Sequence, residues 1–245
     1  MNKNKAIAIA FAGIVIIVSA WLLAMGVTNF REEKAKIYVT GLAEKQITSD
    51  LIVWDISASA TAADRNSTFA KYKRVANIVR KFLVNSGIAD SCISTTSIDL
   101  SEVTKEIYDA RVKHYITVHD GYSASQTFTV SSKDIPTVEK VYQNISELYN
   151  QGIDFSISTP LYYYTKLNEL KMEMLEKASQ NAYERAQIIA KGSNASVGKL
   201  VSSSMGVFQI VGLNSDEEYS WGGTFNTSSK QKVASITLKT SYLVK

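Results

Sequence analysis

The sequence predicts an α+β fold that follows one apolar N-terminal segment. Some stretches space their apolar residues as a helix does and end at glycine, while others alternate apolar and polar residues as a half-buried strand does. The two kinds are mixed along the chain without strict alternation, which favours α+β over a doubly wound parallel sheet. An uncharged run over residues 6–27 stands apart from the more polar remainder.

Three helices are predicted in that remainder. The first covers 65–85 and stops at Gly87, the second opens near Asp134 and stops at Gly152, and the third covers 166–191 and is closed by Gly192. Glycine ends helices because it adopts the left-handed conformation readily. The third helix carries an apolar stripe with steps of three and four, made of Leu167, Leu170, Met174, Ala178, Ala182, Ala186 and Ile189.

Strands with one wet face are predicted over 52–60, 125–131 and 234–244, which indicates antiparallel sheets covered by helices on one side. Two stretches interrupt this pattern. Glu102–Asp120 is charged and is predicted to form a long hairpin. Leu213–Gln231 is a polar loop whose aromatic residues either mark a contact surface or fold back on the domain; these are Tyr219, Trp221 and Phe225.

The apolar run over residues 6–27 would form a helix of roughly 33 Å, at about 1.5 Å per residue, enough to cross a hydrocarbon core of about 30 Å. We therefore expect a membrane anchor over 1–30 and a globular domain over 31–245, with the short N-terminus inside and the domain outside. A cleaved signal peptide is the alternative, because Ala24 and Gly26 form a small-x-small site.

The composition predicts no familiar chemistry. The net charge of +4 is mild and its basic residues do not cluster, so no nucleic-acid partner is expected. The single cysteine, Cys92, excludes an intrachain disulfide. His114 and His119 are five residues apart and would face opposite sides of a strand, which argues against a metal site. A Ser-His-Asp triad would have to use one of these two histidines as its base, and this scarcity argues against it. We expect no catalytic residue, no metal and no cofactor.

Five stretches in order resemble the SIMPL domain family, also called DUF541: Tyr38–Glu44, Thr48–Leu51 (with Ser49 where proline is usual), Gly121–Gln126, Ala178–Gly198 and Val233–Leu243. The resemblance spans about 36–245. It implies an α+β domain of two small lobes, each a sheet with packed helices, in a family whose bacterial members are periplasmic or outer-membrane-associated. The family has no agreed enzymatic activity, and its members are linked to envelope stress and oligomeric assembly.

These observations together predict a single-pass inner-membrane protein, or after cleavage a secreted periplasmic one, that acts as a non-enzymatic assembly or interaction module of the cell envelope. Its partner would be a second copy or another envelope protein. The alternative is an enzyme or small-ligand binder that uses a cleft between the two lobes. The run Tyr162–Tyr164 should lie on a strand and face both ways, so the candidate contact residues are Tyr163, Tyr219, Trp221 and Phe225.

Overall fold

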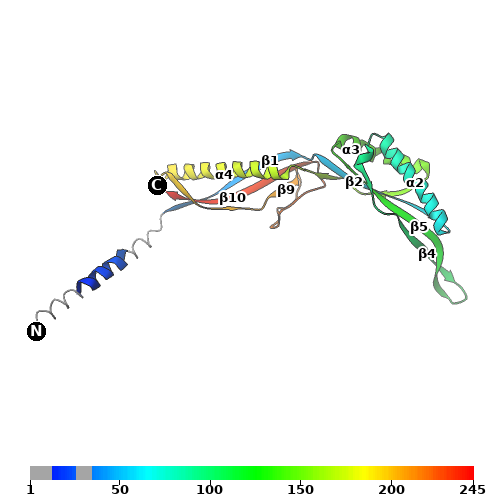
Figure 1. The fold of residues 1–245 in the computed structure, drawn as a ribbon, viewed down its shortest axis with the longest axis horizontal. Helices are drawn as coiled ribbons and strands as arrows, with labels where there is room; N and C mark the ends of the chain where they lie inside the picture. Colours follow the sequence, from blue (N-terminus) through cyan, green and yellow to red (C-terminus); the bar gives the residue numbers. More distant parts are fainter. Residues whose placement is uncertain (1–12, 26–34) are drawn as a thin grey trace, which may run out of the picture. The chain divides into compact units, whose positions relative to one another are not determined.

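The structure, a computed structural model, describes residues 13–25 and 35–245. It confirms the predicted α+β class, with helices packed on two antiparallel sheets (Figure 1). The chain forms two compact units. Unit 1 comprises Met1–Leu42, Lys177–Gly206 and Thr237–Lys245, and unit 2 comprises Ala43–Glu176 and Val207–Ile236.

A helix over residues 13–25 precedes the sheets. Its apolar side chains are exposed, among them Ile16, Ile17 and Leu23. The predicted anchor over 6–27 lies partly outside the described residues, which include only 13–25 of it. Within the described chain, no helix is long and apolar enough to span a membrane.

Unit 2 contains a six-stranded antiparallel sheet built around β2 (Leu51–Ala62). On one side β2 pairs with β5 (His114–Ser132), and on the other with β6 (Asp154–Ile157) and β7 (Leu161–Tyr163). The outer side of β5 pairs with β3 (Ile93–Thr95) and β4 (Asp99–Asp109). Two helices cover one face, α2 (Arg65–Asn85) and α3 (Ile135–Asn144) (Figure 1).

The alternation along β2 decides which face of this sheet the helices cover. Even-numbered residues from Ile52 to Ala60 are buried, and with Tyr72 of α2 and Phe128 of β5 they form the core of unit 2. The odd-numbered residues face away and pair with serines and threonines of β5, so the uncovered face is polar. Ser57 and Thr127, for example, share a hydroxyl–hydroxyl bond of 2.9 Å across the two strands.

The four-stranded sheet has the order β1-β10-β8, and β9 also pairs with β10. Its strands are β1 (Lys36–Thr48), β8 (Val197–Met205), β9 (Gln209–Gly212) and β10 (Gln231–Val244). The long helix α4 (Leu167–Gly192) runs along this sheet (Figure 1). The buried residues of α4 are Leu170, Met174, Ala178, Ala182, Ala186 and Ala190, so the predicted stripe is correct from Leu170 to Ala186, while Leu167 is half-buried. Ile189 is exposed, because the steps of four reach Ala190 instead.

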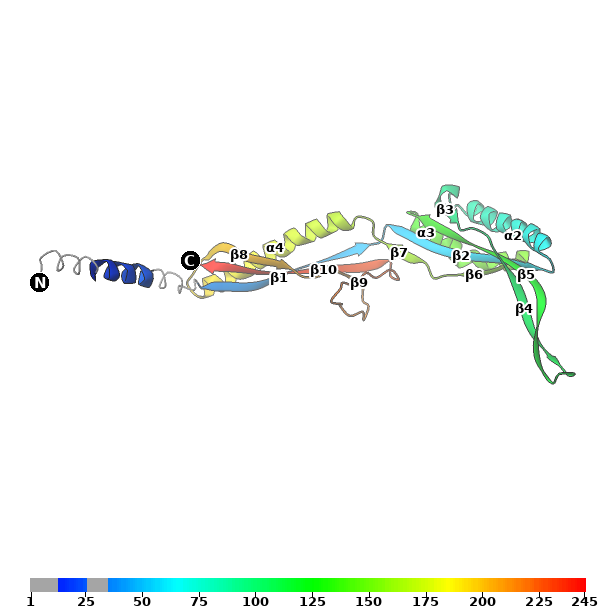
Figure 2. The same ribbon diagram turned by 60° about the horizontal axis from the view of Figure 1, so that its bottom comes forward.

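The other predicted elements are largely confirmed. Helix α2 begins at the Asp64 cap and is followed by Gly87, whose φ is +99°. Helix α3 ends earlier than predicted and continues as a 3₁₀ segment, Ile145–Gln151, capped by Gly152 with φ +71°. Strands β4 and the first half of β5 form the predicted hairpin, a two-stranded ribbon that extends away from α2 (Figure 2). A short 3₁₀ turn, Asp90–Cys92, precedes β3.

Candidate functional site

The predicted aromatic loop, residues 213–230, connects β9 to β10 within unit 2. At its tip is a four-residue turn, in which the backbone N–H of Gly223 donates to the carbonyl of Ser220 at 3.2 Å. Gly223 has a φ of +94°, a conformation that other residues rarely adopt. Trp221 is the second residue of this turn and is 99% exposed. A side chain this large is seldom so fully exposed to water.

A buried glutamine fixes both sides of that turn. The Nε2 of Gln209 donates to the carbonyl of Ser220 at 2.7 Å, and its Oε1 accepts from the backbone N–H of Thr224 at 2.7 Å. On the same strand, Ile210 donates its N–H to Thr224 at 2.7 Å and accepts from the N–H of Asn226 at 2.9 Å. The turn that carries Trp221 is therefore held from both ends by the strand beneath it.

A buried lysine holds the returning part of the loop. Lys232, on β10, is fully buried, and its Nζ donates to three oxygens: the carbonyl of Asn226 at 2.8 Å, Oδ1 of Asn226 at 3.2 Å and the carbonyl of Ser229. Each of the three ammonium protons thus has an acceptor. Burial lowers the pKa of Lys232 to about 8, and the charge of Glu217 partly opposes this shift.

Glu217 binds to the same cluster from the outgoing side of the loop. Its Oε2 accepts from the backbone N–H of Gly212 at 3.0 Å, and its Oε1 accepts from Nδ2 of Asn226 at 2.5 Å. These bonds, the one from Gly212 above all, lower the pKa of the Glu217 carboxyl. Asn226 therefore links a carboxylate on one side of the loop to an ammonium group on the other, which makes the loop a defined structure rather than a loose excursion.

The structure brings together two of the four predicted contact residues. Tyr163 lies on β7, and its ring centroid is 6.5 Å from that of Phe225, which lies on the returning side of the loop. Tyr219 and Trp221 lie on the outer part of the loop, both exposed. Strand β7 ends at Tyr163, so the prediction of three tyrosines on one strand is wrong for Tyr164.

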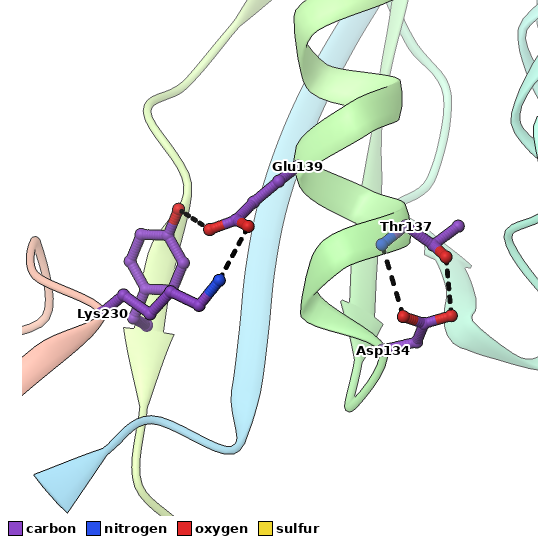
Figure 3. Close-up of polar contacts among 5 residues, drawn as sticks. Asp134, Thr137, Glu139 and Lys230 are labelled. Atoms are coloured by element: carbon purple, nitrogen blue, oxygen red, sulfur yellow. Dashed lines mark hydrogen bonds and ion pairs between the residues drawn. The ribbon is translucent and has the colours of Figure 1, made fainter.

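The neighbouring Tyr162 faces the opposite way and packs against the core of unit 2. Its hydroxyl donates to Oε1 of Glu139 on α3 at 2.9 Å, and Oε2 of Glu139 accepts from Nζ of Lys230 at 2.8 Å. Figure 3 shows Glu139 reaching from α3 toward Lys230, which immediately precedes β10. Burial, together with the bond to Glu139, raises the pKa of Tyr162 to about 12. The carboxylate thus links α3 to β7 and to the end of the loop.

The two histidines have different hydrogen-bond partners. On the ribbon, Nδ1 of His119 is 2.6 Å from Oε1 of Glu102, whereas Nδ1 of His114 is 3.1 Å from the carbonyl of Val112. Over residues 13–25 and 35–245, no three side chains of the metal-binding types come together in a way that would hold an ion.

Four residues that fix the loop were not predicted: Gln209, Glu217, Asn226 and Lys232. The burial of Lys232 could have been predicted, because it lies in the same alternation as the inward-facing residues of β10, which are Ala234, Ile236 and Leu238. A lysine in the buried phase of a strand requires oxygen acceptors nearby. Gln209 and Asn226 had no such signal, because polar residues are ordinary at the ends of strands and in loops.

In a comparison with models of protein families, residues 37–239 match the family described as "SIMPL: Protein of unknown function (DUF541)". The match covers most of the chain, from the start of β1 into the last strand, β10. A comparison with curated proteins gave no match.

Proposed function

The chain belongs to the SIMPL family of proteins of unknown function (DUF541), and from that premise we propose that it is a membrane-anchored, extracytoplasmic assembly module of the cell envelope. Its role is to bind proteins, either a second copy of itself or another envelope protein, and it performs no catalysis. The single observation that carries this proposal is the presentation of Trp221, 99% exposed, at the tip of a loop fixed by buried polar side chains.

The construction of the loop supports a role in binding. Enclosing the ammonium of Lys232 removes it from water, and its three hydrogen bonds are formed with the loop itself. The result is a loop whose backbone on both sides of Trp221 is held in place before any partner arrives. Tryptophan and tyrosine are frequent hot-spot residues in protein interfaces, and a preorganised loop loses less conformational entropy on binding.

The N-terminal segment supports the membrane attachment. Residues 6–27 contain no charged side chain. In the helix over 13–25, the large apolar side chains are exposed. Lys3 and Lys5 precede this segment, an arrangement found in signal-anchor sequences. We place the protein in the inner membrane as a single-pass protein, with its domain on the periplasmic side.

Assembly is tested by measuring the mass of the full chain in mild detergent by light scattering over a range of concentrations. A defined mass above that of one chain is expected, and Trp221→Ala should reduce it while Met172→Ala, on the exposed side of α4, should not. A single-chain mass at every concentration, together with no protein retained on the immobilised full chain from an envelope extract, would refute the proposal.

Attachment is tested separately in cells. The full chain should stay in the membrane pellet at alkaline pH, and protease added to the outside of spheroplasts should digest its domain. Replacing Ile17 and Leu22 with lysine should release it or prevent its export. A mature protein that lacks the first residues by mass, and that is found in the soluble periplasmic fraction, would replace the anchor with a cleaved signal peptide.

A further inference from the structure

The two compact units carry opposite net charge. The described residues of unit 1 include a single acidic side chain, Glu184, and seven basic ones, at positions 36, 177, 185, 191, 199, 239 and 245. Unit 2 has 20 acidic and 16 basic residues. A protein that is mildly basic as a whole is therefore divided into a strongly basic and an acidic part, which attract each other between molecules.

Strand β1 is an edge of its sheet in unit 1, and its free side can be identified from its hydrogen bonds. The carbonyl of Ala35 accepts from the N–H of Val244, so odd-numbered residues point their backbone groups toward β10. The backbone N–H and C=O groups of the even-numbered residues then point away from β10, toward the open edge. Consistent with this, the carbonyl of Thr40 accepts from Nη1 of Arg185 at 2.7 Å, and the N–H of Leu42 donates to Oδ1 of Asn181 at 3.1 Å.

Side chains of α4 thus cap the open edge at Thr40 and Leu42. Next to it lies a groove of about 360 Å³ between β1 and α4, which we call the β1 groove; it is lined by Tyr38, Val39, Thr40, Arg185, Ile188 and Ile189. Tyr38 and Ile188 are each 72% exposed. Arg185 is the basic residue among those that line it. Two lysines share its neighbourhood through Tyr38: Lys36 lies two residues earlier on the same strand, and Lys239 lines a second hollow together with Tyr38. The β1 groove therefore combines apolar residues with basic ones.

The aromatic loop of unit 2 has the complementary character. Asp216, Glu217 and Glu218 directly precede Tyr219 and Trp221. Glu217 is occupied by the internal cluster of the loop, whereas Asp216 and Glu218 are exposed and form no ion pair with any described residue. The loop thus presents the exposed aromatic side chains of Tyr219 and Trp221 beside two carboxylates that form no ion pair with any described residue.

We propose that the aromatic loop of one copy binds the β1 groove of a second copy, with Trp221 between Tyr38 and Ile188 and with Asp216 and Glu218 facing Lys36 and Lys239. This inference rests on the proposed assembly function and names its interface. Because the two surfaces differ, the contact is heterologous, and successive copies add head to tail until a ring closes or a filament grows.

The experiment uses two variants of the full chain in mild detergent, each with one surface disabled. The loop variant combines Trp221→Ala with Glu218→Lys, and the groove variant combines Ile188→Glu with Lys239→Glu. None of these side chains takes part in the hydrogen bonds that fix the loop or cap β1. Met172→Glu, also on an exposed position of α4, is the matched control.

Each double variant alone should lose assembly, with association weakened at least tenfold, while the Met172→Glu control should assemble as the wild type does. The decisive sample is the mixture of the two variants. Each retains the surface that the other lacks, so the mixture should form pairs of two chains and nothing larger, seen by light scattering and by energy transfer between differently labelled variants. High salt should dissociate these pairs.

The outcomes separate this inference from the proposed function. If both variants still form the oligomers that the wild type forms, the loop-to-groove contact is overturned and the assembly function stands. A mixture that stays monomeric while each variant alone is monomeric would also overturn it, because the intact surfaces would then fail to pair. A wild type that is monomeric at every concentration would remove the self-assembly on which the inference rests.

Discussion

Both units pack helices on an antiparallel sheet, but they do so with side chains of opposite size. In unit 2 the contact is filled by large residues, with Trp54, Tyr72 and Phe128 almost fully buried. In unit 1 the contact between α4 and β1 is made by Gly41 against Ala178 and Ala182, close enough that a Cβ on Gly41 would overlap the carbonyl oxygen of Ala178. One unit gains stability from the area it buries, and the other from close approach of two backbones.

The difference has a consequence for the surface. Because α4 turns its alanines toward the sheet, its larger apolar residues near this end, Ile188 and Ile189, are left outside, where they line the β1 groove. In unit 2 the large residues are used in the core, and exposed aromatic residues are found on the loop and the ribbon. We therefore expect unit 2 to be sensitive to removal of volume and unit 1 to its addition.

Trp54→Ala should have the largest effect, because it removes the largest fully buried side chain of unit 2, including its edge-to-face contact with Tyr142 at 5.4 Å. A loss of about 3–5 kcal/mol in the free energy of unfolding is expected, measured by chemical denaturation followed by circular dichroism. Trp54→Phe should cost less, since it keeps a ring and removes an indole N–H that has no partner in the described chain. A loss below about 1 kcal/mol for alanine would contradict the importance of volume here.

Gly41→Ala tests unit 1 by the opposite change. One added methyl group would meet the Ala178 carbonyl and lie 2.8 Å from Cβ of Ala182, so α4 must move away from β1. We expect a loss of about 3 kcal/mol, at the upper end of overpacking effects. Gly192→Ala, at the end of the same helix, is the matched control because nothing lies within 4 Å of its added Cβ. Equal losses in the two variants would show that helix or strand propensity, and not close approach, explains Gly41.

The buried lysine of unit 2 should make stability depend on pH with an unusual sign. The pKa of Lys232 falls from 10.5 to about 8 in the folded state. Below about pH 8 the amine of Lys232 is protonated in both the folded and the unfolded chain. Between about pH 8 and 10.5 it is protonated in the unfolded chain and neutral in the folded chain. The free energy of unfolding contributed by this group therefore rises across that window, by about 1–3 kcal/mol.

Comparison with Lys232→Met isolates this contribution, because methionine cannot titrate. The difference in unfolding free energy, wild type minus variant, should grow as the pH is raised from 8 to 10.5, in denaturant titrations at several pH values. Amide exchange should also show faster opening of the loop in the variant, since the acceptors on Asn226 and Ser229 lose their donor. A difference that stays flat with pH would mean that Lys232 keeps its proton throughout.

Much of the fold could be predicted because its signals are local. Helix α2 has its aspartate cap directly before it and its closing glycine two residues after it, and β2 shows its buried phase at every second residue. The end of α4 was predicted correctly, but the last residue of its buried stripe was not, because Ile189 and Ala190 both continue a helical stripe. The choice of Ala190 depends on how closely α4 approaches the sheet, and that distance is a tertiary property.

The candidate site was predicted only in its exposed part. Aromatic residues in a polar stretch drew attention to Tyr219, Trp221 and Phe225, and Tyr163 does lie near Phe225. What holds them was missed, because Gln209 and Asn226 act through backbone groups that are distant in sequence or hidden within the loop. The β1 groove was missed for a similar reason: it exists only once β1 lies beside α4.

The smallest of the expected effects concerns the N-terminal cap of α3 in unit 2. Asp134 caps α3, accepting from the N–H of Thr137 at 3.3 Å and from its hydroxyl at 2.7 Å (Figure 3). Asp134→Ala should cost about 1 kcal/mol, and Asp134→Asn much less, because asparagine still accepts the backbone hydrogen bond. Since α3 also carries Glu139, the alanine variant should loosen the link from Glu139 to Lys230, seen as faster amide exchange where the loop meets β10. If exchange there is unchanged while stability falls, the loop is fixed by its own buried cluster alone.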